Sequence, residues 1–520
     1  MFLSSLLRDL ELNKHIDNEV AKDLQPRGSQ PAKLYGLPKI HKEGIPMRPV
    51  LSMINTAQYK IAKFLDEKLK PLINSEFECK DSFEFSNFIS QFSASSSEEY
   101  MVSFDVSSLF TNVPLIETIN LCCSLWENNV TSHDIIDSYG FRKLLEFSTS
   151  NVHFLFNNEW FKQRDGVAMG YSLAPTLASI FLSSLEQNIA SFNLDKPLVY
   201  KRYVDDVFLI FKHKSHTLPF LNFLNGLHVN IKFTFEEEKN SAISFLDLFI
   251  QRNGSKYETE IYRKNTDTGL YVTPQSFCES KYRRNMINGL IFRSWSLSSS
   301  FKKSVKSIDK LLELLHLNGY SNFFLKRVTR NTVDKIINKI KSDENVEIDS
   351  TIPVVIDPDK IKISSGFTLT IPFSEGFKDF KNSILRLSGN VNFKIASTSH
   401  KIVSMFSNKS KTPTGLCSDL VYQYKCNGCN ATYIGETARH LCTRVQEHGR
   451  LSGYSNIAEH NKQCNKEIGI MNFDILASGF KNYWERVSHE ALMIKQLSLK
   501  LIFKMLPQPL FYEFLFNITY

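Results

Sequence analysis

The sequence lacks several features that would place it among membrane, repeat or disordered proteins. It has no run of about 18 uncharged apolar residues, so it does not predict a membrane-spanning helix. Its short apolar start is interrupted by Arg8, Asp9 and Glu11, which is more typical of a helix than of a signal peptide. There is no internal repeat and no long low-complexity tract, which argues against a solenoid or a disordered chain.

What is present is typical of an ordinary globular protein. The chain has 520 residues, of which 42% are hydrophobic and 22% are charged. Its length predicts roughly two to four domains with ample cores. The net charge of +8 permits a nucleic-acid partner without requiring one.

The cysteines point to metal binding rather than to disulfides. There are nine, an odd number, and more than half of them lie between Cys417 and Cys464. Such crowding in a chain without a secretion signal favours metal ligation.

Periodicity and breakers divide the chain into recognisable segments. The sequence predicts the following, in order: strands and turns over 26–50, a strand over 101–107, a helix over 173–190, a hairpin turning at 253–254, basic helices over 285–340, linkers over 341–366 and 407–415, and a small α/β unit from 417. The piece 367–403 mixes a strand with a helix.

Two adjacent acids lie inside the apolar run from 201 to 211. Neighbouring side chains of a flat strand point to opposite faces, so one of Asp205 and Asp206 would be desolvated. A tight turn at the pair would keep both carboxylates at one polar place, where a divalent cation would cancel their repulsion. The alternative is a solvated turn without a ligand.

A third acid completes a possible metal site. Asp105 lies on the polar face of the strand predicted over MVSFDVSSLF. With Asp205 and Asp206 it could hold two Mg²⁺ ions about 4 Å apart, the arrangement used for nucleotidyl transfer. Three carboxylates suffice because Mg²⁺ takes further ligands from substrate phosphates. Asp105 as a plain strand-end acid is the alternative.

The motifs FDVSSLF, GVAMGYSLAP, YVDD and FLDL, in that order, resemble the palm of a reverse transcriptase. LYGLPKIHK and MRPV upstream resemble finger motifs of the Penelope-like retroelement branch, so that the resemblance covers roughly residues 30–330. It implies an α+β multidomain chain with a right-hand polymerase fold. Fingers and palm would occupy 1–285, a helical thumb 286–345 and a connector 346–415.

The resemblance also implies roles for individual residues. Asp105, Asp205, Asp206 and the carbonyl of Val106 would hold Mg²⁺. The substrate-binding positions would be Arg48 and Lys39 for the triphosphate, Phe110 as a steric gate against a 2′-hydroxyl, Gly170 for close backbone approach and Tyr203 against the primer end. A core Phe110, a surface Arg48 and a solvated charged face on the thumb helices remain alternatives.

A second group of residues lies near the end of the chain. VYQYKC and ATYIGE predict two short strands joined at CNGC. The following helix carries Arg444 and His448 one turn apart, and the later helix WERVSHEALMIK carries Glu490 beside an apolar stripe. Without further function, this would be a tyrosine-rich hairpin packed on two helices.

This unit, residues 416–505, resembles a GIY-YIG endonuclease, a small α/β domain that Penelope-like elements carry after their reverse transcriptase. The matching site residues are Tyr422, Tyr433, Arg444, His448 and Glu490. Glu490 would bind a single Mg²⁺, Arg444 would stabilise charge on the scissile phosphate, and one tyrosine would accept a proton from the attacking water.

The cysteines supply a probable second metal site in the same unit. Cys426-x-x-Cys429 has the spacing of a zinc knuckle, and His460-x-x-x-Cys464 offers a second pair on a predicted helix. Penelope-type nuclease domains carry a comparable set, in which a histidine is more usual at the position of Cys464. His448 competes with His460 as the third ligand, and four ordinary thiols and imidazoles are the alternative to zinc.

Together these resemblances imply an RNA-directed DNA polymerase with a DNA-nicking endonuclease, which integrates a retroelement by target-primed reverse transcription. The expected partners are an RNA template, a DNA primer or target and deoxynucleoside triphosphates, without a membrane. The genomic DNA target implies a nuclear location. The alternatives are a decayed relic that binds RNA–DNA hybrids without chemistry and a telomerase-like enzyme that extends DNA ends.

Both ends of the chain depart from the family pattern. About 30 residues precede LYGLPKIHK, fewer than the family usually has, so we expect a fragment or a late start. Residues 506–520 match no closing motif and form a divergent tail, which is compatible with a decayed or frame-shifted copy.

Overall fold

The computed structural model describes most of the chain, and all structural statements below apply to the described residues. These are 2–26, 29–40, 43–73, 75–96, 98–129, 135–150, 152–343, 367–387, 393–399, 412–429, 431–449, 455–464, 467–480 and 483–497. Within them, no helix has the length and apolar character needed to cross a membrane.

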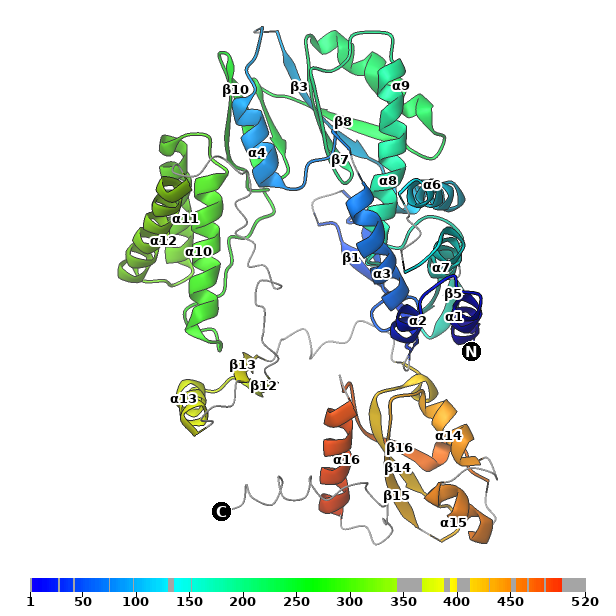
Figure 1. Ribbon diagram of the computed structural model, residues 1–520. Helices are drawn as coiled ribbons and strands as arrows, with labels where there is room; N and C mark the ends of the chain where they lie inside the picture. The colour runs from blue at the N-terminus through cyan, green and yellow to red at the C-terminus, as the bar shows by residue number, and fades with distance from the viewer. Residues whose placement is uncertain are drawn as a thin grey trace.

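A four-stranded antiparallel sheet, which we call the palm sheet, forms the centre of the first half of the chain (Figure 1). Its order is β6-β7-β3-β8, with β3 Tyr100–Val106, β6 Val199–Tyr203, β7 Asp206–Phe211 and β8 Phe233–Glu237. As the alternation in the sequence predicts, Val102, Phe104 and Val106 are buried, whereas Ser103 and Asp105 are partly exposed.

Both faces of the palm sheet are covered. One face packs against the mostly apolar helix α8 (Ala174–Glu186), where Leu177 and Phe181 are fully buried. On the other face, Phe85 and Ile89 of α4 (Ser82–Gln91) contact residues of β3 and β7. Asp81 caps the start of α4 by accepting hydrogen bonds from the backbone N–H groups of Phe83 and Glu84. The palm sheet is therefore a layer packed between α8 and α4, and this packing holds the turns at its ends.

The strands predicted over 26–50 form two strands of a second four-stranded sheet, which we call the finger sheet. Its order is β2-β1-β4-β5, with β1 Ala32–Pro38, β2 Met47–Ser52, β4 His153–Phe156 and β5 Glu159–Lys162. The helices of this half are α1 Phe2–Leu12, α2 Asn18–Leu24, α3 Tyr59–Leu69, α5 Leu109–Asn112, α6 Leu115–Glu127, α7 Ser138–Ser150 and α9 Thr217–Leu227, with short 3-10 turns η1 Lys70–Leu72, η2 Gln187–Ser191 and η3 Lys214–His216. The helix predicted at the start of the chain is thereby confirmed.

A small sheet and three helices follow the palm. The sheet has the order β11-β10-β9, with β9 Ala242–Phe245, β10 Leu248–Asn253 and β11 Lys256–Ile261. The predicted hairpin forms, but because Asn253 still pairs with Lys256, its turn is at 254–255 and not at 253–254. Helices α10 Ser280–Ser296, α11 Phe301–Leu317 and α12 Asn322–Asp343 pack around their own apolar core. The predicted thumb boundary after residue 285 falls inside α10, because the helix begins before the apolar positions that signal it.

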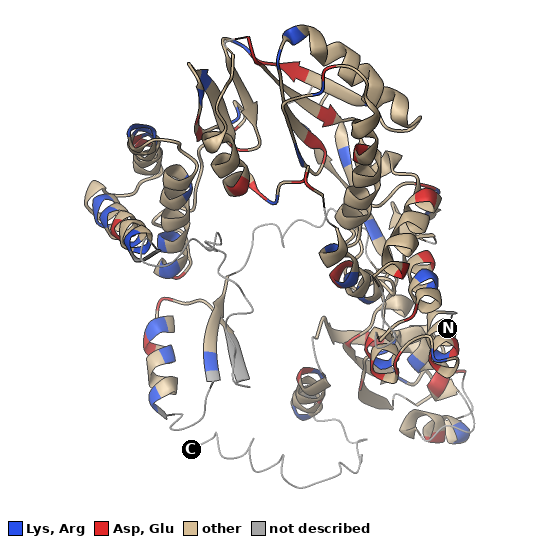
Figure 2. Cartoon of the chain, turned by 45° about the horizontal axis from the view of Figure 1, so that its top comes forward, with Lys and Arg blue, Asp and Glu red and all other residues tan. Residues whose placement is uncertain are grey.

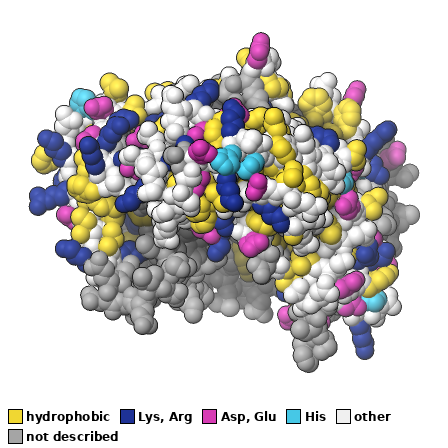
Figure 3. Space-filling model, turned by 90° about the horizontal axis from the view of Figure 1, so that it is seen from above, with side chains coloured by type: hydrophobic (Ala, Val, Ile, Leu, Met, Phe, Trp, Pro, Cys, Tyr) yellow, Lys and Arg dark blue, Asp and Glu magenta, His cyan; other side chains and the backbone are white. Residues whose placement is uncertain are grey.

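Charge distinguishes two surfaces of this half. Lys and Arg residues outnumber acidic residues along α12. Figure 2 shows these basic positions in blue on the group of helices α10–α12, which we call the thumb helices. By contrast, the end of the molecule seen from above in Figure 3 mixes basic, acidic, histidine and apolar side chains. In the same half of the chain, charges are paired in the contacts Lys214–Glu237 at 2.8 Å and His213–Glu98 at 2.8 Å.

The last part of the chain forms two separate units. Strands β12 Phe367–Pro372 and β13 Phe393–Thr398 pair in parallel and flank α13 Phe377–Leu387. The C-terminal unit is an antiparallel sheet of order β15-β14-β16, made of β14 Leu420–Lys425, β15 Thr432–Thr437 and β16 Phe473–Ser478, with α14 Leu441–Gly449, α15 Asn456–Cys464, α16 Tyr483–Leu497 and the turns η5 Thr414–Leu416 and η6 Ile470–Asn472.

Helix α16 is fixed to the sheet by a buried arginine. Arg486 contacts Asp419 at 2.7 Å and Glu436 at 2.9 Å. This fork places the following turn of α16, which carries Glu490, against β14 and β15. The predicted tail 506–520 and most of the first predicted linker lie outside the described residues.

Candidate functional site

The three predicted polymerase carboxylates lie together at one end of the palm sheet. In the antiparallel pairing of β3 with β7, Asp105 stands directly opposite Asp206. The turn between β6 and β7 contains Asp205, whose carbonyl accepts a hydrogen bond from the backbone N–H of Val106 at 3.0 Å. The structure thus brings together residues that are far apart in the sequence.

The pKa of Asp206 reflects both its burial and the repulsion among the three acids. Burial, then the charges of Asp205 and Asp105, raise the pKa of Asp206 to about 6, and Lys264 partly opposes this shift. A bound cation would relieve that repulsion. Carboxylate oxygens are the protein ligands that Mg²⁺ prefers, so this donor set fits that ion.

The turn that carries the acids is strained. Val204 has a φ of 57°, in the left-handed region that a β-branched residue rarely adopts. Such conformations cost about 1–3 kcal/mol and persist where the surrounding structure enforces them. Sequence reasoning predicted the turn but not its strain, because no glycine or asparagine marks it.

The loop before α8 lies against the finger sheet through a glycine. Gly170 has a φ of +93°, and a Cβ there would stand 2.8 Å from the carbonyl oxygen of Leu51 on β2. The backbone N–H of Leu51 donates to Met169 at 2.7 Å. Only glycine fits this close approach, which ties the loop to the strand that bears Arg48.

The other predicted substrate contacts lie around this loop and the catalytic turn. Phe110 is half-buried in α5, and its carbonyl accepts from the N–H of Val167 at 2.7 Å. Arg48 is exposed on β2, and Lys39 is half-buried just after β1. Tyr203 is 37% exposed at the end of β6, opposite Asp206 in the hairpin. Their proposed roles stay predictions.

Sequence reasoning missed a buried ion pair next to the turn. Arg202 is 1% exposed, and its Nε donates to Glu186 of α8 at 2.5 Å. A signal was present, because Ser179, Ser183 and Glu186 form a polar stripe on an otherwise apolar helix. Such a stripe in a buried helix predicts a polar partner from another element.

In the C-terminal unit, three of the five predicted nuclease residues, Tyr422, Arg444 and His448, meet at the hydroxyl of Tyr422. This hydroxyl lies 2.8 Å from Nε2 of His448 and accepts from Nε of Arg444 at 3.3 Å. Nδ1 of His448 lies 2.8 Å from the hydroxyl of Ser455, which sequence reasoning missed. When Nδ1 carries the ring proton and donates a hydrogen bond to Ser455, Nε2 accepts a hydrogen bond from the hydroxyl of Tyr422.

The electrostatics of this cluster keep Tyr422 and His448 neutral in the resting state. Burial and the nearby charge of Arg444 lower the pKa of His448 to about 4, so that the imidazole is neutral at pH 7. Burial raises the pKa of Tyr422 and of Tyr433, and the charge of Glu490 contributes to both shifts. Glu490 therefore lies close enough to both phenols to act on them.

Gly435 allows the two tyrosines to approach each other. A Cβ at this position would stand 2.6 Å from the hydroxyl oxygen of Tyr422 and 2.8 Å from a ring carbon of Tyr433. Any larger residue would displace the hydroxyl on which Arg444 and His448 converge.

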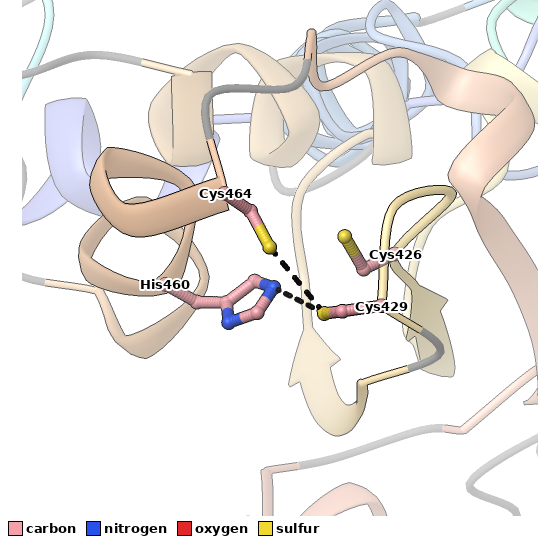
Figure 4. A group of neighbouring side chains, drawn as sticks. All are labelled: Cys426, Cys429, His460 and Cys464. Atoms are coloured by element: carbon pink, nitrogen blue, oxygen red, sulfur yellow. Dashed lines mark hydrogen bonds between the residues drawn. The ribbon is translucent and has the colours of Figure 1, made fainter.

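A possible metal site lies beside this cluster (Figure 4). One ligand atom from each of Cys426, Cys429, His460 and Cys464 lies within 4.8 Å of the others. Cys429 Sγ is 3.3 Å from Nε2 of His460 and 3.4 Å from Sγ of Cys464. Three thiols and one imidazole are the donor set of a structural Zn²⁺ site.

The geometry decides between the two histidines that competed for this set. His460 is a member of it, whereas His448 is 1% exposed and engaged with Tyr422 and Ser455. The spacing along the chain could not separate them, because both histidines follow the knuckle within one small unit.

A family model covers the first site. Residues 40–270 match the family model of reverse transcriptase (RNA-dependent DNA polymerase). The chain therefore contains a reverse transcriptase domain, and that domain holds Asp105, Asp205 and Asp206. No curated protein matches the chain significantly.

Among solved structures, the chain is similar to two yeast telomerases and a viral polymerase. Telomerase from Candida albicans in complex with a fragment of telomeric RNA has 12% identity and a TM-score of 0.42, over 60% of this chain and 61% of that one. Apo telomerase from Candida tropicalis has 14% identity and a TM-score of 0.39, over 62% of each chain. Sicinivirus RNA-dependent RNA polymerase has 13% identity and a TM-score of 0.40, over 60% of this chain and 69% of that one. The chain thus spans less than two thirds of either telomerase.

Neutralising one acid should stabilise the metal-free polymerase site. Because the pKa of Asp206 is raised in the folded state, its charge costs stability above pH 6, and this cost is relieved as the pH falls toward 4. We expect Asp206→Asn to raise the free energy of unfolding at pH 7 by about 1–2 kcal/mol, after discounting for partial exposure. Thermal denaturation without added Mg²⁺ measures the effect.

Two comparisons accompany this measurement. Asp309→Asn changes an exposed acid on α11 and should leave the melting temperature unchanged. Added Mg²⁺ should stabilise the wild-type chain more than Asp206→Asn. A variant no more stable than wild type would contradict the repulsion described here.

The cysteine set should carry one zinc ion. We expect metal analysis of the purified chain to give about one Zn²⁺ per molecule, and Cys429→Ser to lose it together with stability of the C-terminal unit. Cys442→Ser changes a half-buried thiol of the same unit outside the set and should retain the metal. Equal zinc content in the two variants would refute the assignment.

Proposed function

We propose that the chain is an RNA-directed DNA polymerase joined to a DNA-nicking endonuclease, which acts in the integration of a Penelope-like retroelement. The observation that carries the polymerase half is the convergence of Asp105, Asp205 and Asp206 within the reverse transcriptase domain. Burial and repulsion by the other two acids raise the pKa of Asp206, as is expected at a site built to hold divalent cations.

In the polymerase site, Asp105, Asp205, Asp206 and the carbonyl of Val106 would hold two Mg²⁺ ions. Bound there, these ions would activate the primer 3′-hydroxyl and neutralise charge on the triphosphate. Arg48 and Lys39 would hold the triphosphate oxygens, for which the planar guanidinium of arginine is well suited. The basic thumb helices would contact the primer–template backbone.

Selectivity and alignment fall to neighbouring residues. Phe110, held by its contact with the loop at Val167, would exclude a 2′-hydroxyl and so favour deoxynucleotides. Gly170 would let the backbone approach the substrate, and Tyr203, exposed beside Asp206, would lie against the primer end.

The nuclease half of the proposal is that the C-terminal unit is a GIY-YIG endonuclease. It is supported by the contacts of Tyr422 with His448 and Arg444 and by the nearness of Glu490. Tyr422, with its hydroxyl oriented by His448 and Arg444, would act as the general base toward the attacking water. Arg444 would stabilise the charge that develops on the phosphate. Glu490 would bind one Mg²⁺, and Tyr433 would complete the pocket.

The resemblance to Penelope-like elements suggests the proposed reaction, target-primed reverse transcription. The nuclease unit nicks genomic DNA in the nucleus, and the polymerase extends the exposed 3′-hydroxyl along an RNA template. The zinc-binding set would hold the β14–β15 hairpin to α15 and so support the nuclease fold.

Primer extension tests the polymerase half. We expect the full chain to extend oligo(dT) on poly(rA) with dTTP and Mg²⁺, and Asp205→Ala to lower the rate on the order of 10³-fold. Asp195→Ala, an exposed acid of the same domain, is the control and should extend normally. A wild-type chain that binds the hybrid without extending it would instead indicate a relic.

Plasmid nicking tests the nuclease half separately. The wild-type chain should convert supercoiled DNA to the open circular form in Mg²⁺, and Glu490→Ala should abolish this while leaving primer extension intact. Glu485→Ala changes an exposed acid of the same helix and should nick normally. Equal nicking by wild type and Glu490→Ala would show that the metal ligand is misassigned.

A further inference from the structure

A buried cation lies directly beside the turn that carries the polymerase acids. Arg202 is on β6 and its side chain is 1% exposed. A guanidinium is stable in a core only when hydrogen bonds and a counter-charge compensate for its lost hydration. The groups that surround Arg202 therefore indicate what it is placed to hold.

On one side, Arg202 is clamped by α8. Its Nε and Nη2 donate to the two carboxylate oxygens of Glu186 at 2.5 and 3.1 Å, and Nη2 also donates to Ser183 Oγ at 3.1 Å. Such a two-point fork fixes the orientation of the guanidinium as well as its position. Burial lowers the pKa of Arg202, but the charge of Glu186 more than offsets this and keeps the group protonated.

The backbone of Arg202 is held as firmly as its side chain. Its N–H donates to the carbonyl of Phe77 at 2.7 Å, and its carbonyl accepts from Cys79 at 2.8 Å. The segment around Glu78 therefore forms a bridge beside β6, and Glu78 accepts a hydrogen bond from Ser179 of α8 at 2.7 Å.

On the other side, Arg202 contacts the catalytic turn. Nη1 donates to the carbonyl of Val204 at 3.4 Å. Val204 is the residue with the left-handed φ of 57°, and the next carbonyl, that of Asp205, accepts from Val106 at 3.0 Å. Both carbonyls of the turn are thus held from outside, one by the guanidinium and one by β3.

We propose that Arg202 is a positioning residue for the polymerase reaction: clamped by Glu186 and Ser183, it holds the Val204 carbonyl and so fixes the direction in which Asp205 and Asp206 point. It touches neither substrate nor metal. The inference rests on the proposed polymerase function, and it links α8, whose first turn follows the Gly170 loop, to the metal-binding turn.

The test separates positioning from stability. Replacing the buried pair in Arg202→Met with Glu186→Met removes both charges together, which tends to preserve folding better than removing one of them. The Tyr200 hydroxyl loses its contact with Glu186 in this variant.

A matched control replaces Arg252 and Glu238 by methionine, because this ion pair lies in the same half of the chain with side chains 11% and 5% exposed. Arg252 bonds to Glu99, Glu238 and Ser241 rather than to the turn. Arg202→Lys keeps the charge but loses the fork.

Single-nucleotide extension and Mn²⁺ binding followed by electron paramagnetic resonance provide the readouts. We expect the Arg202/Glu186 double variant to lose about 10²-fold in kcat with KM for dTTP changed less than about threefold, because misplaced groups slow chemistry more than binding. Its Mn²⁺ affinity should fall several-fold. Arg202→Lys should lose at least about tenfold in kcat at an unchanged melting temperature, and the Arg252/Glu238 control should keep its kcat.

Each result has a definite meaning. A folded Arg202/Glu186 double variant that keeps wild-type kcat and Mn²⁺ affinity overturns the proposal and makes the pair merely structural. If the double variant does not fold, full activity in Arg202→Lys overturns it equally. If the wild-type chain extends no primer, the proposed function fails. In that case Mn²⁺ binding alone tests the inference, and a double variant with wild-type Mn²⁺ affinity would overturn it.

Discussion

The register between β3 and β7 is the constraint on which the polymerase half depends. Antiparallel pairing sets Asp105 opposite Asp206 at the place where the β6–β7 turn presents Asp205. A shift of one residue would turn every side chain of β3 to the other face and send Asp105 into the core. The apolar positions Val102, Phe104 and Val106 prevent that shift, since all three are buried on one side. Hydrophobic burial thus holds three like charges in place against their repulsion.

Both sites store unfavourable electrostatics within a rigid frame. In the palm, the cost appears as the raised pKa of Asp206 and the strained backbone of Val204. In the C-terminal unit, it appears as a buried tyrosine and a histidine whose pKa is lowered to about 4. Such costs are borne by the surrounding core and are common where groups must be ready for catalysis.

The two frames differ in how they are held. The palm sheet lies between α8 on one side and α4 with the small β9–β11 sheet on the other, so that it has a large core of its own. The C-terminal unit has a small core. There, the Arg486 fork holds α16 to the sheet, and a zinc ion at the Cys426 set would add to the cohesion. This is the expected compensation in a small domain, where buried apolar area is limited.

The sequence by itself determined the local elements and the residue types of both sites. Alternation predicted β3 with Asp105 on its polar face, the adjacent acids predicted the turn, and C-x-x-C predicted the knuckle, because each signal has a short period. Tertiary structure decided which distant groups meet: His460 rather than His448 at the cysteines, Glu186 at Arg202, and the hydroxyl of Tyr422 over Gly435. The same residue types recur in each segment, and only the packing of strands and helices far apart in the chain selects among them.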